Sequence, residues 1–311
     1  RAAAPAAPPH SRAAACALLG AVMCERAEEH APHLGPVLAA LVGAINAPQP
    51  AVVRAAWGAL DALVKALPKE RYPLHVHTLR EALASLADEA RAAARKAAAA
   101  EGSDMAGQAA AAGRVEVAGL ALPKGLAPLV AVYLHSLMTG SAELREAAAL
   151  ALGEAIGLTP VAALKPFVIQ ITGPLIRVIG DRFPAGVKAA ILAALTLLLG
   201  RSPAALKPFV PQLQTTFVKS LSDAQQSVRA RGAAALAALA AIATRLEPLL
   251  TELANGVATA EPDVAASHLA ALAGVVRRVP KPLSPELLAK VEQAALAQLA
   301  APDEARAAAA P

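Results

Sequence analysis

The stretch Leu206-Lys-Pro-Phe-Val-Pro-Gln-Leu-Gln-Thr-Thr-Phe-Val-Lys-Ser-Leu-Ser-Asp223 decides the fold. Within it an apolar residue recurs every four positions, at Phe209, Leu213, Phe217 and Leu221. This spacing places all four side chains on one face of an α-helix. The pattern ends at Asp223, and a second apolar helical pattern begins near Val228 and runs to Ile242. We therefore expect two helices joined as a hairpin.

The same hairpin pattern recurs along the chain about every forty residues. Each first helix contains a proline near its start, where the missing N–H removes no helical hydrogen bond. The repeated motifs are Leu126-Ala-Pro-Leu129, Leu164-Lys-Pro-Phe167, Leu206-Lys-Pro-Phe209 and Leu246-Glu-Pro-Leu249. A repeat of this length and kind predicts an all-α fold, an α-solenoid of HEAT-type helical hairpins.

The pattern divides the chain into three parts. We expect N-terminal helical repeats over residues 1–100, an Ala/Gly-rich loop or insertion over residues 101–120, and regular HEAT repeats over residues 121–311. The last repeat is expected to be truncated, because the pattern of a second helix begins near Pro302 and the sequence ends soon afterwards. We also expect Pro174 and Pro211 to kink the helices that contain them.

The composition favours closely packed helices and a mildly basic surface. Hydrophobic residues make up 56% of the chain but aromatic residues only 2%, and the net charge is +5. Such a charge permits contact with nucleic acid or with an acidic protein surface. The longest uncharged apolar runs reach about a dozen residues, whereas a membrane-spanning helix needs about twenty. We therefore expect no membrane span.

The two cysteines indicate a reducing compartment. Cys16 and Cys24 lie on one predicted helix. Their spacing corresponds to roughly 12 Å of helical rise, which is too far for a disulfide bond. Free thiols are typical of an intracellular protein.

No motif for catalysis or cofactor binding occurs in the sequence. A nucleophile elbow, a P-loop and a dinucleotide-binding fingerprint are all absent. His30 and His33 lie beside Glu28 and Glu29, but no zinc-ligand spacing accompanies them. A solvated helix end explains these histidines better than a metal site. We therefore expect no enzyme activity, no cofactor and no small-molecule substrate.

A basic residue recurs near the start of the second helix in three successive repeats, at Arg145, Lys188 and Arg229. One interpretation is an internal ladder in which Asp181 and Asp223 pair with these bases and tie neighbouring repeats together. The other is a basic stripe that faces a partner. Further bases would strengthen the stripe: Arg177, Arg182, Lys207, Lys219 and Arg231. Such a stripe could contact RNA phosphates, although the few aromatic residues argue against base stacking.

Four stretches carry a resemblance to a known family. They are Ile171-Thr-Gly-Pro-Leu-Ile-Arg-Val-Ile-Gly-Asp-Arg-Phe183, the stretch from Ala205 to Asp223, Leu122-Pro-Lys-Gly125, and Thr139-Gly-Ser-Ala-Glu-Leu-Arg-Glu-Ala-Ala148. Together they resemble the C-terminal HEAT region of the general-control translational activators. The resemblance is strongest over residues 117–255 and continues more weakly on both sides. The Ala-rich segment 95–115 departs from the family, and His135 stands where a basic residue is expected.

The resemblance implies a non-catalytic scaffold fragment. Proteins of this family associate with stalled ribosomes and activate the starvation-sensing kinase of initiation factor two. The implied partner is the RWD domain of that kinase, with the ribosome contacted through the full-length protein in the cytoplasm. We expect the docking surface to comprise Arg145, Lys188, Arg229, Arg177 and Arg182.

Two other functions remain open from the residues alone. A transport or assembly adaptor of the importin type would present arrays of Trp and Asn on an inner face, and Trp57 is the only tryptophan. A ribosomal-RNA-binding solenoid would use the basic stripe for phosphate contacts.

Overall fold

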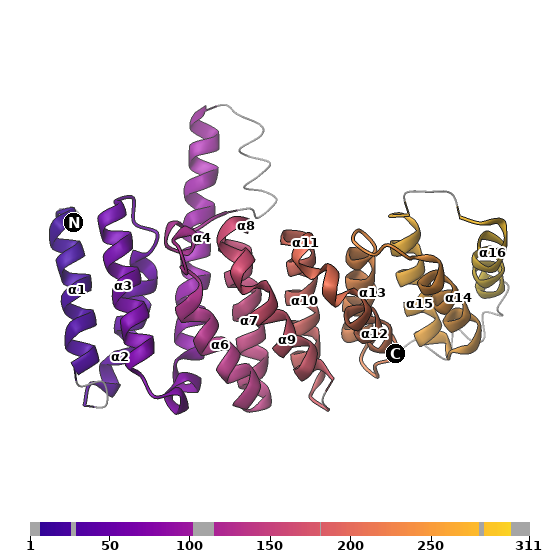
Figure 1. Ribbon diagram of the computed structural model, residues 1–311, viewed down its shortest axis with the longest axis horizontal. Coiled ribbons are helices and arrows are strands. Elements are labelled where there is room, and N and C mark those ends of the chain that lie inside the picture. Colours follow the sequence, from indigo (N-terminus) through magenta and orange to yellow (C-terminus); the bar gives the residue numbers. More distant parts are fainter. Residues whose placement is uncertain (1–6, 26–28, 102–114, 181, 280–282, 300–311) are drawn as a thin grey trace. The chain divides into compact units, whose positions relative to one another are not determined.

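The computed structural model describes residues 7–25, 29–101, 115–180, 182–279 and 283–299. Every regular element in these ranges is a helix (Figure 1), which confirms the predicted all-α class. By its internal contacts the chain forms two compact units, residues 1–174 and residues 175–311.

The first unit is built mainly from paired antiparallel helices. Its α-helices are α1 (Pro9–Glu25), α2 (Ala31–Ala44), α3 (Pro50–Ala66), α4 (Val76–Glu101), α6 (Ala127–Thr139), α7 (Ala142–Leu158), α8 (Val161–Leu164) and the first half of α9 (Val168–Ile179). Its 3-10 helices are η1 (Lys69–His75), η2 (Ala118–Ala121) and η3 (Lys165–Phe167). Helix α1 packs against α3, α2 against α4, and α7 against both α4 and α6. The C-terminal half of α4 extends past its neighbours in this unit (Figure 1).

The second unit shows the stacked hairpins most clearly. After the end of α9 its helices are α10 (Ala185–Arg201), α11 (Pro203–Leu206), η4 (Lys207–Phe209), α12 (Val210–Ser220), α13 (Gln226–Leu239), α14 (Glu247–Thr259), α15 (Pro262–Val276) and α16 (Pro285–Leu299). Helices α12 and α13 form one hairpin, and α14 and α15 form the next. The second helices stack as α10 on α13 on α15, and α14 packs on α16. Each hairpin therefore buries its apolar face against its neighbours, as a HEAT solenoid requires.

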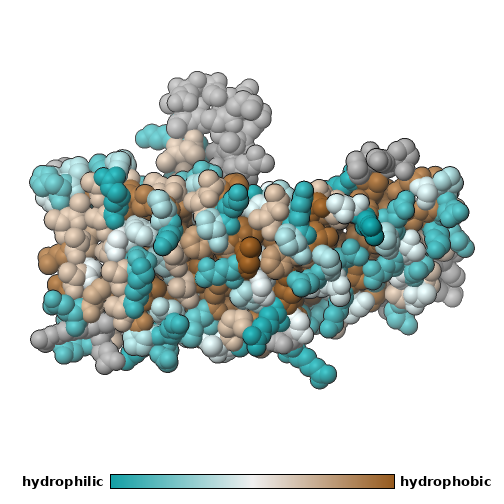
Figure 2. Space-filling model, in the orientation of Figure 1, coloured by the Kyte–Doolittle hydropathy of each residue, from teal (hydrophilic) through white to brown (hydrophobic). Residues whose placement is uncertain are grey.

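The stretch that predicted the fold behaves largely as expected. Leu213, Phe217 and Leu221 are fully buried, whereas Phe209 is half-buried. Phe209 differs because it ends the 3-10 turn η4 and does not lie on α12 itself. Figure 2 shows hydrophilic residues interspersed with hydrophobic ones on the visible face of this unit. The apolar stripe is thus the part of the helix that faces the neighbouring hairpin.

The first helices break at Lys-Pro-Phe turns that precede the two prolines, Pro174 and Pro211, at which kinks were predicted. The helical path tightens to a 3-10 turn at Lys165–Phe167 and again at Lys207–Phe209. Helix α9 continues through Pro174, and Pro211 lies in the first turn of α12. A proline in the first turn removes no intrahelical hydrogen bond. The kink predicted at Pro211 is therefore misplaced, because the break occurs at the preceding Lys-Pro-Phe.

One stretch of the described residues passes a length-and-composition test for a membrane span. Residues Val161–Ile179, taken as one helix, are long and apolar enough to cross a membrane by length and composition. The helices Ala185–Arg201 and Pro203–Ser220 meet the same criterion only if they are counted together as one span, and the chain bends by 119° between them. However, 44% of the apolar window of Val161–Ile179 is buried inside the protein. Core helices of solenoids pass the same test, so this is weak evidence for a membrane span.

The end of the predicted 101–120 loop is hydrogen-bonded to other segments of the first unit. The backbone N–H of Val117 donates to the carbonyl of Leu158 at 3.0 Å, and that of Gly119 donates to Ile45 at 2.8 Å. A Cβ at position 119 would lie 2.5 Å from the Cβ of Ile45, so only glycine fits there. Residues 102–114 lie outside the described residues.

His135, the predicted departure from the family pattern, contributes to packing in the first unit. Its ring lies 5.6 Å from that of Tyr72 at an interplanar angle of 86°, an edge-to-face arrangement. Such aromatic pairs are favourable beyond the area they bury. The phenol of Tyr72 in turn donates to the carbonyl of Val64 at 2.9 Å. The imidazole therefore helps to hold η1 against α6.

Small residues let the helices of the first unit approach closely. Gly20 of α1 is buried against α3, and a Cβ there would lie 2.7 Å from the Cβ of Ala59. Gly58, the neighbour of Ala59, is exposed and has nothing within 4 Å of its own ideal Cβ position. A side chain at position 20 would therefore clash with a neighbouring helix, whereas one at position 58 would meet open space.

We expect opposite effects from alanine at these two glycines. Gly20→Ala should lower the free energy of unfolding by about 1–3 kcal/mol, because overpacking a close helix contact costs this much. Gly58→Ala should raise it by about 0.5–1 kcal/mol, because alanine is the better helix former. Urea unfolding followed by circular dichroism measures both. A Gly20→Ala protein as stable as Gly58→Ala would show that α1 and α3 are not in close contact.

Candidate functional site

The first of the recurring bases contacts the end of the preceding helix. Arg145 donates from Nε to the carbonyl of Gly140 at 2.8 Å and from Nη1 to the carbonyl of Leu137. Both carbonyls belong to the C-terminal end of α6, where the helix dipole is negative. The cation lies in the first turn of its own helix, where it gains nothing from that helix's dipole. Arg145 therefore contributes to the fold through its hydrogen bonds to the end of α6.

The second base forms the ladder contact that the sequence predicted. Lys188 in the first turn of α10 donates to Oδ2 of Asp223, in the turn after α12, at 2.7 Å. The side chains of Lys188 and Asp223 are 25% and 13% exposed. This contact joins two successive hairpins, so the ladder interpretation is confirmed for this pair.

Asp223 is held in its ionised form by this environment. Partial burial raises its pKa, but the hydrogen bonds from Lys188 and from the backbone N–H of Gln225, with the charges of Lys188 and Arg229, outweigh that effect. The net result is a pKa below the usual value of an aspartate. The carboxylate therefore remains a charged partner for Lys188 at neutral pH.

The third base is buried between two repeats. Arg229 is 6% exposed. Its Nη1 donates to the carbonyls of Asp223 and Ala224 at 3.0 and 3.1 Å, and its Nε donates to the hydroxyl of Ser267 at 3.1 Å. Its Nη2 lies 3.5 Å from Oδ2 of Asp263. The guanidinium thus links α13, the preceding turn and α15. Asp181, the other acid of the predicted ladder, lies outside the described residues.

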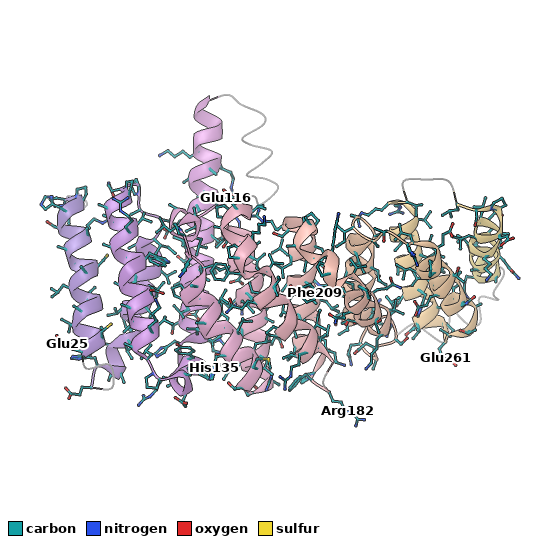
Figure 3. The ribbon with its side chains drawn as sticks, viewed as in Figure 1. Glu25, Glu116, His135, Arg182, Phe209 and Glu261 are labelled. Atoms are coloured by element: carbon teal, nitrogen blue, oxygen red, sulfur yellow. The ribbon has the colours of Figure 1, made fainter. Side chains whose placement is uncertain are left out.

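The remaining predicted docking residues are exposed. Arg177 lies in the last turn of α9, and Arg182 lies in the segment between α9 and α10. Arg182 projects away from the ribbon in Figure 3. Arg145 belongs to the first unit and the other four bases to the second. The predicted set therefore contains two exposed bases and three that hold the fold.

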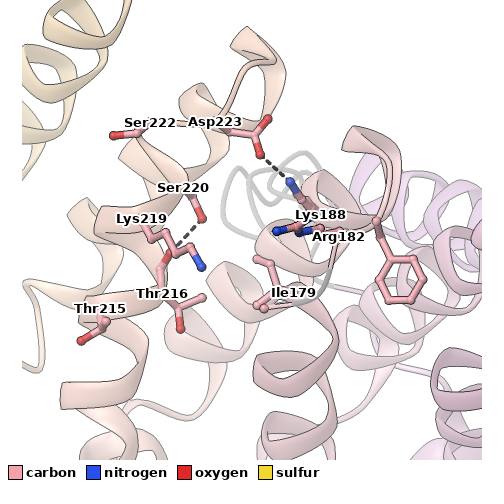
Figure 4. A pocket seen from close by; sticks show the side chains of 11 residues that line it. Ile179, Arg182, Lys188, Thr215, Thr216, Lys219, Ser220, Ser222 and Asp223 are labelled. Atoms are coloured by element: carbon pink, nitrogen blue, oxygen red, sulfur yellow. Dashed lines mark hydrogen bonds and ion pairs between the residues drawn. The ribbon is translucent and has the colours of Figure 1, made fainter. Parts of the chain in front are cut away.

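Two of these bases line a groove of about 670 Å³ between successive hairpins of the second unit. We call it the basic groove. Its lining residues come from the α9–α10 connection, from α12 and from the turn after α12: Ile179, Gly180, Arg182, Phe183, Lys188, Thr215, Thr216, Lys219, Ser220, Ser222 and Asp223. Arg182 and Lys188 lie on one wall and Lys219 on the other (Figure 4). Asp223 is the one acid among the described lining residues, so the groove attracts anions.

Three of the four hydroxyl side chains in the described lining of the groove donate to backbone carbonyls. Those of Thr215 and Thr216 donate to the backbone carbonyls of Pro211 and Gln212 at 3.1 and 2.8 Å. That of Ser220 donates to the carbonyl of Thr216 at 2.8 Å. The groove therefore offers a ligand mainly cationic N–H groups. Sequence reasoning gave Lys219 only a supporting role, because its place opposite Arg182 depends on how the hairpins stack.

Metal ligation has no candidate in the part of the chain that the structure describes. No group of three or more His, Cys, Asp or Glu side chains is close enough to hold an ion there. Cys16 and Cys24 are both free thiols. The chemistry available at the basic groove is thus recognition of negative charge.

We expect Arg145→Ala to destabilise the fold. Hydrogen bonds from a charged group contribute about 1.5–3 kcal/mol, so the free energy of unfolding should fall by that amount in urea denaturation. Arg54, exposed on α3 in the same unit, provides the matched control. Its substitution by alanine should change stability by less than about 0.5 kcal/mol. Equal stability of the two variants would contradict the role of Arg145 at the end of α6.

Comparison with known proteins identifies a family model and relatives that this chain resembles. The family model described as "Stalled ribosome sensor GCN1-like, HEAT repeats" matches residues 2–124. The human stalled ribosome sensor GCN1 is 37% identical over 266 residues, which cover 85% of this chain and 9% of the human protein. The Saccharomyces cerevisiae eIF-2-alpha kinase activator GCN1 is 48% identical over 165 residues, which cover 52% of this chain and 6% of the yeast protein. The chain thus spans less than a tenth of these relatives.

A solved structure supports the fold alone. A chain in the complex of Kap95p with RanGDP superposes on 96% of this chain and 38% of its own length, with a TM-score of 0.52 and 14% sequence identity. Identity this low carries no functional information. The superposition agrees with the helical repeat architecture described above.

Proposed function

The chain is a GCN1-like HEAT-repeat region, and on that premise we propose that it is a non-catalytic scaffold segment that docks the RWD domain of the initiation-factor-two kinase. In this proposal the docked kinase is activated on stalled ribosomes during amino-acid starvation. The full-length protein contacts the ribosome, in the cytoplasm. The names of these relatives, a stalled ribosome sensor and a kinase activator, support a proposal that links this chain to a kinase and to stalled ribosomes.

One observation carries the proposal: three cationic residues from two successive hairpins line one groove. Arg182 and Lys219 are exposed, and Lys188 is half-buried and paired with Asp223. Complementary charge across an interface speeds association and selects the partner. The basic groove therefore suits an acidic surface of a folded protein. Arg177 is exposed in the last turn of α9, close in sequence to the groove, but it does not line the groove.

The predicted docking residues take different parts in this proposal. Arg177 and Arg182 contact the partner, and Lys188 contacts it at the base of the groove. Arg145 and Arg229 act indirectly, because their donors are engaged by backbone carbonyls at the ends of hairpins. Their substitution should affect binding only as far as it affects folding.

Titration calorimetry of this chain with the isolated kinase RWD domain tests the proposal. Arg182→Glu and Lys219→Glu should each weaken binding by about tenfold or more, since a hot-spot residue at an interface contributes about 1–3 kcal/mol. Arg245→Glu is the matched control, because Arg245 is exposed in the same unit and does not line the groove. Absence of any binding by the unmodified chain would refute the proposal. An equal loss of affinity in Arg245→Glu would show that the effect comes from the net charge of the chain and not from the groove.

The two alternatives make different predictions. Ribosomal RNA binding would show a steep decrease of affinity with salt, which filter binding measures. An importin-type adaptor would need tryptophan on its inner face, but the indole N–H of Trp57 donates to the carbonyl of Gly125 at 3.1 Å. Trp57 therefore has a structural role in the first unit.

A further inference from the structure

The charge balance of the basic groove points to a particular kind of anion. Among the described lining residues, Arg182, Lys188 and Lys219 are positive and Asp223 is negative, which leaves a net charge of +2. A carboxylate would neutralise half of that charge. A phosphorylated serine or threonine carries about −1.5 to −2 at pH 7 and three acceptor oxygens.

We propose that the basic groove binds a phosphorylated serine or threonine on a partner protein segment. This inference rests on the proposed docking role of the same groove and names the chemistry of the docked segment. It adds a regulatory step, because a kinase acting on the partner would then control docking.

The placement of the cations fits a group with several oxygens. Lys219 faces the groove from α12, while Arg182 and Lys188 face it from the opposite wall (Figure 4). One of the three ammonium N–H groups of Lys188 is used by Asp223, and an ammonium carries three donors. Cations on two walls can each contact a different oxygen of one phosphoryl group, whereas a carboxylate has only two oxygens.

The apolar part of the lining suits the rest of such a side chain. Ile179 is buried with 8% exposure, and both it and the half-buried Phe183 line the groove beside the cations. A phosphothreonine methyl group or a phosphoserine methylene could pack there. The hydroxyls of Thr215 and Thr216 already donate to backbone carbonyls, so the cations would provide the contacts to phosphate.

The shape of the groove favours a single phosphoryl group over a nucleic acid strand. An RNA backbone presents a row of phosphates and binds best to a track of cations with aromatic platforms. Here the cations of the described lining are confined to one groove, and Phe183 is the one aromatic residue in that lining.

Replacement of Asp223 distinguishes an electrostatic effect on ligand binding from an effect on the stability of the fold. Its carboxylate lies inside the groove and repels an incoming anion, while its pairing with Lys188 holds the turn. Asp223→Asn should therefore tighten binding of a phosphorylated ligand although it removes an ion pair from the fold. A residue that acted only through stability would weaken binding when replaced.

Fluorescence anisotropy with the full 311-residue chain tests the proposal. The probe is a labelled twelve-residue peptide of Gly, Ala and Ser with one central phosphoserine. Its two twins are control peptides of the same sequence that carry serine or glutamate at the central position. The phosphopeptide should bind roughly tenfold or more tightly than either twin. Arg182→Ala and Lys219→Ala should each remove most of that difference, Asp223→Asn should increase the affinity, and Arg245→Ala should leave it unchanged.

Several outcomes would overturn the proposal. Equal binding of the phosphorylated and unphosphorylated peptides, or unchanged binding in the Arg182→Ala/Lys219→Ala double variant, would exclude a phosphate site. Tighter binding of a single-stranded RNA oligonucleotide of the same length would assign the groove to RNA. Displacement of the peptide by equimolar inorganic phosphate would show that the site holds the free ion and not a segment.

The same variants separate this inference from the proposed function. Titration of the unphosphorylated RWD domain in parallel reports docking without phosphate. If the peptide shows no preference while Arg182→Ala and Lys219→Ala still weaken RWD binding, the phosphate inference fails and docking stands. If the peptide preference holds while the RWD domain does not bind, docking of that domain fails and the phosphate site stands with another partner.

Discussion

The fold depends on one recurring interaction, a cation near the start of a second helix that contacts the preceding or the following hairpin turn. Arg145 donates to the last carbonyls of α6, Lys188 pairs with Asp223, and Arg229 donates to the turn carbonyls at Asp223 and Ala224. Arg145 shows why a cation is useful there, because the end of α6 leaves carbonyls without intrahelical partners. A charged donor satisfies them more strongly than water does, because its hydrogen bonds are charge-assisted. These contacts hold the hairpin turns in place, and the apolar faces of the helices pack against one another.

This use of cations determines which charges remain for binding. In the second unit Arg229 is buried and Lys188 is paired, so Arg182 and Lys219 are the exposed cations that the basic groove presents. They come from two hairpins, and the Lys188–Asp223 contact holds those hairpins together. The binding proposals and the stability of the unit therefore share one ion pair. Substitutions at the groove must be interpreted with a measurement of folding beside them.

Much of the fold could be predicted from the sequence, but the site could be predicted only in part. Apolar residues every four positions and a proline per repeat identify the hairpins, and Leu213, Phe217 and Leu221 are buried as expected. The Lys188–Asp223 pair could also be predicted, since both partners are charged side chains at repeated positions. The contacts of Arg145 could not, because backbone carbonyls leave no trace in a sequence. A polar cluster in the first unit was likewise hidden. There Arg80 donates to Glu154 at 3.2 Å across α4 and α7, and burial raises the pKa of Glu154.

A double-mutant cycle on Lys188 and Asp223 tests the central claim most directly. The free energies of unfolding of Lys188→Ala, Asp223→Ala, the double variant and the unmodified chain give the coupling energy between the two side chains. If this pair holds successive hairpins together, the coupling should be about 0.5–3 kcal/mol, as for residues in direct contact. Additive effects within about 0.3 kcal/mol would show two independent surface charges and contradict the account.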